Sequence, residues 1–230
     1  MAEIYMVDIN EPISNDLYQQ LFNYVSNERK ARVNRYKFEA DAKRSLYAGV
    51  LVNYLVCTKL HLKKEEVHLE YNEYGKPYLS NSTNQFFNIS HSGKWVVCAW
   101  SNKEIGVDIQ QIEAADLDIA RRFFLKEEYL SIAKLKGRQQ REAFYTLWTL
   151  KESYIKYKGR GLAIPINSFQ LIYEKEHAFI RTQETNAVML HMINIDEEHK
   201  LAVCTEDSEM ASTTYMSLET IYTKLDKLHN

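Results

Sequence analysis

One stretch of the chain, QFFNISHSGKWVVCAWSNKEIGVDIQ (residues 85–110), decides how the rest of the sequence is divided. Two apolar runs, at residues 85–90 and 95–100, flank the short polar segment HSGK, which is the pattern of a β-hairpin. A third run, at residues 105–109, follows after a few polar positions and predicts another strand. We expect the boundary between two structural units at residues 102–106.

The segments on either side of this boundary repeat one arrangement, in which helices are followed by strands. Apolar residues at helical spacing predict the helices, and alternating or continuous apolar runs predict the strands. The expected helices lie at residues 14–25, 40–58, 118–124, 126–135 and 141–158, with a short basic helix that begins near Glu28 and is capped by Ser26. The expected strands lie at residues 4–9, 67–71, 85–90, 95–100, 105–109, 168–173, 178–181, 187–195 and 201–205, while residues 219–230 fit either a last helix or a frayed tail. The sequence therefore predicts an α+β protein with two halves of similar size, residues 1–103 and 104–230.

The composition predicts a folded chain with a sizeable core. Of its 230 residues 45% are hydrophobic, and it has only 7 glycines and 3 prolines. Because no low-complexity linker separates the halves, we expect them to pack together. The net charge of −2 argues against general nucleic-acid binding, which needs a basic face.

The cysteines and the N-terminal residues indicate a reducing compartment. Cys57, Cys98 and Cys204 are far apart and form no CxxC pair, which argues against a disulfide framework or a zinc site. The first ten residues lack the apolar run of a signal peptide, and no segment approaches the roughly 20 apolar residues of a membrane span. We expect a soluble, cytoplasmic protein.

Two isolated carboxylates stand among cations. Asp108 lies near the end of the strand at 105–109, and Glu152 shares one face of the helix at 141–158 with Lys156 and Trp148. An aspartate at that place commonly caps a turn, and a Glu–Lys pair four residues apart commonly contributes only about 0.2–0.5 kcal/mol to its helix. The large aromatic ring on the same face instead indicates a second covering surface, such as a cleft. If Asp108 and Glu152 meet in space, they form a seat for Mg²⁺, which prefers oxygen ligands.

The SHSG segment at residues 90–93 has two further interpretations. A serine beside a histidine suggests a hydrolase, but a GxSxG elbow and a third catalytic member are missing. Hydroxyls, a histidine and a glycine amide also suit phosphate oxygens, so an anion site and a purely structural turn stay equally open. The basic run at residues 27–44 fits a solvated face or a patch for a small polyanion, in a chain without a Walker loop or GxGxxG.

Four motifs, taken in order, resemble those of the surfactin-type (Sfp-type) 4′-phosphopantetheinyl transferases: YGKP at 74–77, FNISHSG at 87–93, GVDI at 106–109 and WTLKESYIKYKGRGL at 148–162. Each motif alone is weak, whereas the spaced combination is specific and spans nearly the whole chain. The resemblance implies two similar α+β halves related by a pseudo-two-fold axis, with the active site in the cleft between them. It also implies transfer of the 4′-phosphopantetheine arm of coenzyme A to a serine of an apo acyl- or peptidyl-carrier protein, with Mg²⁺ as cofactor and release of 3′,5′-ADP.

The same resemblance implies the roles of individual residues. Asp108 and Glu152 match the metal-binding carboxylates, and Glu152 also matches the general base for the incoming serine. Lys156 matches the lysine at the pyrophosphate and completes the catalytic set with the two acids. Coenzyme A binding is expected of residues from several parts of the chain, which are Arg29, Arg32, Arg44, Tyr74, Gly75, Lys76, Pro77, Ser90, His91, Lys151 and Lys156.

Gln110 departs from the family pattern, because many members carry glutamate two positions after the aspartate. An amide oxygen still ligates Mg²⁺ or holds a ligand water without adding charge, so Gln110 is the third expected metal ligand. The expected partners are coenzyme A and a carrier protein, with neither nucleic acid nor membrane, and the expected state is a monomer. Nonribosomal peptide and antibiotic biosynthesis is the expected context, while fatty-acid and polyketide carriers stay open. A coenzyme A-binding regulator that transfers poorly is the alternative of another class.

Overall fold

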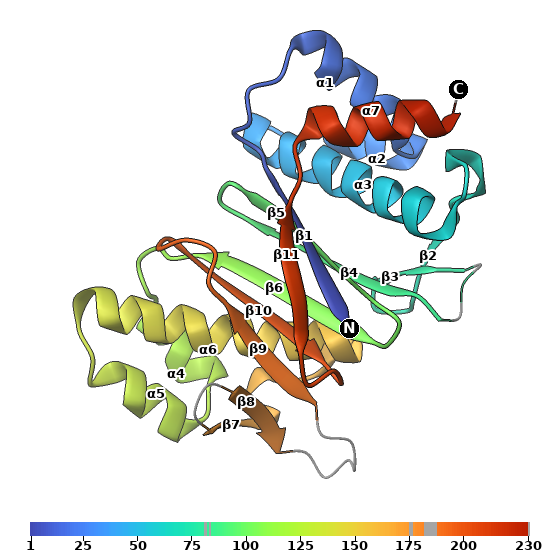
Figure 1. The fold of residues 1–230 in the computed structure, drawn as a ribbon. Helices are drawn as coiled ribbons and strands as arrows, with labels where there is room; N and C mark the ends of the chain where they lie inside the picture. Colours follow the sequence, from blue (N-terminus) through green and yellow to red (C-terminus); the bar gives the residue numbers. More distant parts are fainter. Residues whose placement is uncertain (81, 83, 175–176, 182–187, 230) are drawn as a thin grey trace.

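The computed structural model describes residues 1–80, 82, 84–174, 177–181 and 188–229 (Figure 1). The α-helices are α1 (Asn15–Leu21), α2 (Asn27–Val33), α3 (Glu39–Leu60), α4 (Leu117–Phe123), α5 (Lys126–Ala133), α6 (Gly137–Lys158) and α7 (Leu218–His229), with 3₁₀ turns at Phe22–Tyr24, Lys64–Glu66, Gly161–Ala163 and Ile166–Ser168. The strands are β1 (Ala2–Asp8), β2 (Leu69–Tyr71), β3 (Pro77–Leu79), β4 (Phe86–Ser92), β5 (Trp95–Ser101), β6 (Ile105–Gln111), β7 (Gln170–Glu174), β8 (His177–Arg181), β9 (Met189–Ile193), β10 (His199–Thr205) and β11 (Met210–Tyr215). The α+β class expected from the sequence is confirmed.

The first half is a four-stranded sheet covered by helices. Its strand order is β11-β1-β5-β4, and β4 and β5 form the expected hairpin, in which Ser92 pairs with Trp95. Helix α3 packs on the sheet through apolar residues such as Leu46, Leu51 and Leu55, all fully buried. Figure 1 shows α1, α2, α3 and α7 together on this side of the molecule.

The second half is a five-stranded antiparallel sheet crossed by one long helix. Its order is β6-β10-β9-β8-β7, and α6 lies across β6 and β10 (Figure 1). Leu147, Leu150 and Tyr154, the apolar side expected from helical spacing, are buried against this sheet. The expected strand at 187–195 appears as β9, and residue 187 lies outside the described residues.

The two sheets share a third core between their other faces. It combines side chains of β1 and β5 from the first sheet with side chains of β6 and β10 from the second, which are Ala2, Ile4, Met6, Val97, Ala99, Ile105, Val107, Ile109, Leu201 and Val203. Removal of these apolar side chains from water holds the two sheets face to face. The halves therefore pack as one body, as expected for a chain without a linker.

The division at residues 103 and 104 needs a correction at the C-terminus. Strand β11 pairs in parallel with β1, and α7 buries Leu218, Ile221 and Leu225 in the core of the first half. The segment after residue 209 therefore returns to the first half, although its position in the sequence assigned it to the second. The open choice for residues 219–230 resolves to a helix as far as His229.

In the described part of the chain, helices long enough to cross a bilayer are too polar to do so. Cys57, Cys98 and Cys204 are buried free thiols, each on a different element, so none of them pairs with another.

Candidate active site

Strands β4 and β6 of different halves are joined through side chains rather than through a backbone ladder. Alternate residues of a strand project to the same side, and three such residues of β4 accept hydrogen bonds from backbone N–H groups of β6. This side-chain seam consists of Asn88 Oδ1 with Val107 N at 2.8 Å, Ser90 Oγ with Ile109 N at 3.2 Å and Ser92 Oγ with Gln111 N at 2.9 Å. The seam satisfies N–H groups that would otherwise be buried without partners.

Asp108 is the centre of a polar group beside this seam. Its side chain is only 2% exposed, and its Oδ1 accepts from Lys156 Nζ at 2.7 Å and from Ser90 Oγ at 2.9 Å. Its Oδ2 accepts from Gln110 Nε2 at 3.0 Å. Lys156 also lies 2.8 Å from Ser90 Oγ, so residues of β4, β6 and α6 meet at one place. Charge-assisted hydrogen bonds are short and strong, so the bond to the buried Asp108 carboxylate fixes the ammonium group of Lys156 at this place.

Gly106 explains how α6 comes so close to β6. A Cβ atom built on this residue would lie 2.1 Å from the carbonyl oxygen of Ser153 and 2.3 Å from the backbone nitrogen of Tyr157. Only glycine allows this approach of backbone to backbone. The approach brings Lys156 within reach of Asp108, two residues further along the strand.

Glu152 belongs to the same polar group. It lies one turn before Lys156 on α6, and burial together with the negative charge of Asp108 raises its pKa above the ordinary value, while Lys156 opposes the rise. The charge of Asp108 therefore acts on the carboxylate of Glu152.

His91 and Arg44 lie on the outer side of the group. The side chain of His91 reaches solvent, and partial desolvation together with the positive charges of Lys156 and Arg44 lowers its pKa. Arg44 donates to the carbonyl of Gly93 at 2.7 Å and pairs with Asp41 at 2.6 Å. The positive charges of Lys156 and Arg44 therefore both act on the imidazole of His91.

The YGKP segment docks on the C-terminal end of α6. Asn72 orders this turn, because its Oδ1 accepts from the backbone nitrogens of Tyr74 and Lys76, and its Nδ2 donates to the carbonyl of Gly159 at 2.7 Å. Lys76 bonds to the carbonyl of Tyr157 at 3.1 Å and pairs with Glu104 at 2.9 Å. A hollow of about 220 Å³ lies between this turn and the other half, lined by Tyr74, Gly75, Lys76, Pro77, Asn88, Ile89, Ile155, Lys156, Gly159 and Gly161.

Lys151 does not join these residues, and its predicted place near the phosphates is wrong. Its side chain is 0% exposed inside the second half, where Nζ donates to the carbonyls of Ile166 and Phe169 at 2.9 and 2.8 Å. The third donor pairs with Glu128 at 2.9 Å. All three N–H donors are used within the protein, so this lysine is part of the core.

Arg29 and Arg32 from the predicted set, and Trp148 on the helix face that indicated a cleft, lie in the following surroundings. Arg29 donates to the carbonyl of Ser45 and lines a separate hollow of about 820 Å³ beside α2 and α3. Arg32 pairs with Glu28 on the exposed side of α2. Trp148 does not face a cleft, because it stacks on Phe144 and packs against Phe124.

The sequence did not single out Asn88 or Asn72 and gave Ser92 only as part of the SHSG turn, although all three shape the site. Asn88 and Ser92 left a signal, since polar residues recur at every second position of FNISHS where a fully buried strand would be apolar throughout. Ser90 was expected to bind phosphate, yet its hydrogen is donated to Asp108 and its oxygen accepts from Ile109. Its observed role is to join the halves.

The potential metal ligands are carboxylate and amide oxygens. Within the described ranges, no cluster of three or more His, Cys, Asp or Glu side chains suited to a metal is present. Asp108 and Glu152 supply two carboxylates, and Gln110 supplies an amide beside them. This donor set suits a hard cation that keeps several waters or phosphate oxygens among its ligands.

Comparison with known proteins identifies the family. Residues 11–103 match the family described as 4′-phosphopantetheinyl transferase, N-terminal, and residues 104–204 match the 4′-phosphopantetheinyl transferase superfamily. The chain is 33% identical to the 4′-phosphopantetheinyl transferase Sfp of Bacillus subtilis, over 88% of this chain and 91% of that protein. The chain belongs to the 4′-phosphopantetheinyl transferases. Further relatives of this transferase are gsp of Aneurinibacillus migulanus, 34% identical over 95% of this chain and 92% of that protein, and psf-1 of Bacillus pumilus, 32% identical over 92% and 91%. The resemblance to the Sfp type is confirmed.

Proposed function

We propose that this transferase moves the 4′-phosphopantetheine arm of coenzyme A to a serine of an apo carrier protein, uses Mg²⁺ and releases 3′,5′-ADP. The observation that carries the proposal is the polar group at the meeting of the two halves. There Lys156 lies 2.7 Å from the buried carboxylate of Asp108, and Glu152 is coupled to the same charge. Such a group holds a phosphate ester between a cation and a base.

The residues present fit a divalent cation. Asp108 and Glu152 are like charges in a partly dry place, where burial and, after it, the charge of Asp108 raise the pKa of Glu152. Gln110 offers an amide, whose NH₂ group donates to Asp108 and whose oxygen remains as a further donor atom for a metal or its water. Mg²⁺ bound there supplies charge neutralisation at the pyrophosphate.

Lys156 is the residue proposed to hold the pyrophosphate oxygens. Its side chain is 28% exposed, in contrast to the 2% of Asp108, so it can reach a ligand at the entrance while it remains anchored to the protein. An ammonium group at the leaving phosphate stabilises the charge that develops there. Glu152 is proposed as the base that accepts the proton of the carrier serine, since burial has already moved its pKa toward neutrality.

The remaining cofactor contacts are proposed for the entrance of the site. The hollow beside Tyr74 and Pro77 is proposed for the adenosine end of coenzyme A. His91 and Arg44 are proposed for its phosphates, because the positive charges of both Arg44 and Lys156 act on His91. We further propose a cytoplasmic monomer that serves carrier proteins of nonribosomal peptide and antibiotic biosynthesis, a context that the Sfp-type resemblance supports.

A transfer assay with apo carrier proteins tests the function. The protein is incubated with coenzyme A, Mg²⁺ and, in turn, apo peptidyl- and acyl-carrier proteins. Intact mass spectrometry is expected to show the gain of one phosphopantetheine arm, and chromatography an equal amount of 3′,5′-ADP. Chelation of the metal is expected to stop both.

Matched variants separate this function from its alternatives. Asp108→Asn and Glu152→Gln keep the side-chain volumes and are expected to bind coenzyme A weakly or to transfer slowly. Coenzyme A bound by the unaltered protein without any mass gain on any carrier would instead identify a regulator. Cleavage of an ester substrate without metal, abolished by Ser90→Ala, would identify a hydrolase.

A further inference from the structure

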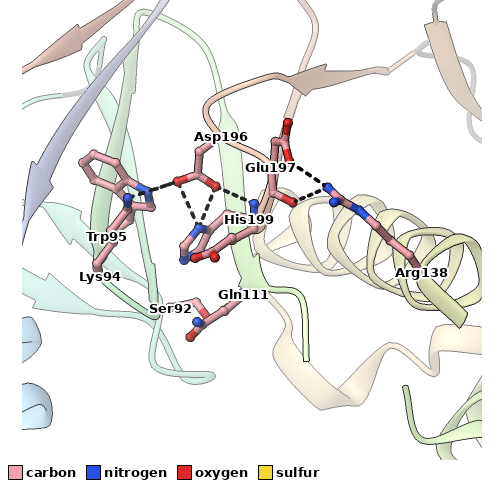
Figure 2. A network of polar contacts seen from close by, with 9 residues as sticks. Ser92, Lys94, Trp95, Gln111, Arg138, Asp196, Glu197 and His199 are labelled. Atoms are coloured by element: carbon pink, nitrogen blue, oxygen red, sulfur yellow. Dashed lines mark hydrogen bonds and ion pairs between the residues drawn. The ribbon is translucent and has the colours of Figure 1, made fainter. Parts of the chain in front are cut away.

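A second polar cluster lies behind the β4–β5 hairpin and has no part in the proposed chemistry. Its centre is Asp196, in the loop between β9 and β10, and His199, the first residue of β10. Figure 2 shows the His199 ring between Asp196 on one side and Ser92 and Gln111 on the other. The cluster therefore stands directly behind the hairpin that presents Ser90 and His91 to the site.

Asp196 joins the second half to this hairpin of the first. It accepts from Trp95 Nε1 at 2.8 Å, pairs with Lys94 Nζ at 3.6 Å and binds His199 Nδ1 through both oxygens, at 2.9 and 3.1 Å. Burial by itself would raise the pKa of Asp196, but hydrogen bonds from Trp95, His199 and the backbone N–H of Glu198 outweigh it and lower the pKa to about 2. The carboxylate is a fixed, charged acceptor for donors from both halves.

His199 fills the space directly behind Gly93. Its side chain is 1% exposed, and its Nε2 is buried without a hydrogen-bond partner among the described residues. A Cβ atom on Gly93 would lie 2.5 Å from this Nε2 and 2.7 Å from Gln111 Oε1. Gly93 has φ +53°, so the turn needs glycine both for its backbone conformation and for the room that His199 and Gln111 take up.

The hairpin turn is thus held from two sides. On the ligand side, Arg44 donates to the carbonyl of Gly93. On the other side, the side chains of His199 and Gln111 occupy the space next to the Cα of Gly93, and the backbone nitrogen of Gln111 donates to Ser92. Ser90 and His91 lie on the same strand, three and two residues before Gly93 respectively, so a shift of the turn would move both.

We propose that Asp196 and His199 form a positioning pair that fixes the SHSG segment (residues 90–93) against β6, so that the coenzyme A site is already formed before the ligand arrives. The pair touches no reacting atom; it acts through Trp95, Gly93 and Gln111. The proposal rests on the proposed function in one respect, since it takes the SHSG segment to face coenzyme A. Loss of the pair should then weaken the binding of coenzyme A more than it slows the transfer step. The reason is that a segment already held in its binding conformation has less conformational freedom to lose when the ligand binds.

Variants of the two residues separate their polar role from their packing. Asp196→Asn turns one acceptor oxygen into a donor, and His199→Phe keeps a ring behind Gly93 but removes the donor to Asp196. Both are expected to raise the KM for coenzyme A about tenfold with kcat within about twofold of the unaltered protein. His199→Asn keeps a donor near the position of Nδ1 and is expected to restore most of the affinity. Trp95→Phe removes one donor to Asp196 and is expected to show a smaller rise.

A neighbouring ion pair provides the control. Glu197, beside Asp196 in the same loop, pairs with Arg138 at 3.3 Å on the surface and does not touch the hairpin (Figure 2). Exposed pairs of this kind contribute little to stability. Glu197→Gln is therefore expected to leave the KM for coenzyme A unchanged.

Hydrogen exchange of the free protein makes the test independent of activity. Asp196→Asn and His199→Phe are expected to speed amide exchange at residues 90–95 and at the Ile109 and Gln111 amides of the seam, with the α3 amides unchanged. If the unaltered protein transfers no arm, the proposed function fails, and the exchange pattern alone then decides whether the pair positions the segment. Unchanged exchange in the hairpin overturns the proposal. So does an unchanged KM, or a fall in kcat that His199→Asn does not restore.

Discussion

Two lysines of α6, Lys151 and Lys156, show how different two regions served by one helix can be. Five residues at 3.6 per turn place them about 140° apart around the helix axis. Lys151 points into the second half, is 0% exposed and has only protein partners. Lys156 points to the meeting of the halves, where its side chain is 28% exposed and bonded to Asp108 and Ser90.

The difference teaches that a cation buried in a core and a cation open to solvent are held in different ways. Burial lowers the pKa of Lys151, and its hydrogen bond and ion pair with Glu128 oppose this effect. Its donors are fully used, so it stabilises the packing of α5 and of the Ile166–Ser168 turn on α6. Lys156 has two side-chain partners and an opening to solvent, which leaves it able to bind an incoming anion.

The largest expected effect separates the two lysines by activity. Lys156→Met is expected to lower kcat/KM for transfer about 10³-fold, because the variant lacks the cation proposed to hold the phosphate group. The measurement is carrier modification followed by mass spectrometry, with the fold checked by circular dichroism. Lys151→Met, assayed at a temperature where it is folded, is the matched control and should retain activity within about twofold. Equal losses in both variants would break the comparison.

The second effect separates them by stability. Lys151→Met is expected to reduce the free energy of unfolding by about 3 kcal/mol, because it leaves the buried carboxylate of Glu128 and two carbonyls without their donor. Urea denaturation measures the change. A double variant, Lys151→Met with Glu128→Leu, removes both charges and should recover part of the loss. If the double variant lost more free energy of unfolding than the two single variants lose together, the broken ion pair would not be the cause of the loss in Lys151→Met.

The third effect extends the comparison to an acid outside the active site. Asp196 has a folded pKa of about 2 against an ordinary value of 3.8, so its stabilisation is fully present above about pH 4 and is lost as the pH falls through 2. The shift corresponds to about 2 kcal/mol of free energy of unfolding. Thermal melts are expected to show that Asp196→Asn loses less stability than the unaltered protein between pH 4 and pH 2. If the melting temperatures of the two proteins fell in parallel between pH 4 and pH 2, Asp196 would not contribute to the loss of stability in acid.

The smallest effect sharpens the site itself. Gln110→Glu adds a third carboxylate beside Asp108 and Glu152 and is expected to tighten Mg²⁺ or Mn²⁺ about fivefold, or to change the preference between them, without abolishing transfer. Calorimetric metal titration of both forms is the measurement. Identical metal affinity and activity would show that Gln110 is no part of the ligand set.

The sequence predicted most elements because their signals are local. The hairpin of β4 and β5 follows from two apolar runs around HSGK, and the buried side of α6 follows from helical spacing of Leu147, Leu150 and Tyr154. Ser26 was recognised as a helix cap, and its hydroxyl accepts from the backbone nitrogen of Arg29. Strands β3 and β11 were missed, since short strands with polar residues carry a weak pattern.

What the sequence alone determined is which residues lie on which side of each element, while the family motifs predicted that Asp108, Glu152 and Lys156 belong to one site. Only the tertiary structure decided what covers each side: a core of carbonyls and Glu128 over Lys151, a polar seam over Ser90, and aromatic rings over Trp148. Only the tertiary structure also showed that β11 and α7 pack in the first half. The physical reason is range. Periodicity records the polarity of a surface through neighbours a few residues apart, whereas the surface that meets it comes from chain far away in sequence, and its identity is settled by packing and hydrogen-bond satisfaction across the whole fold.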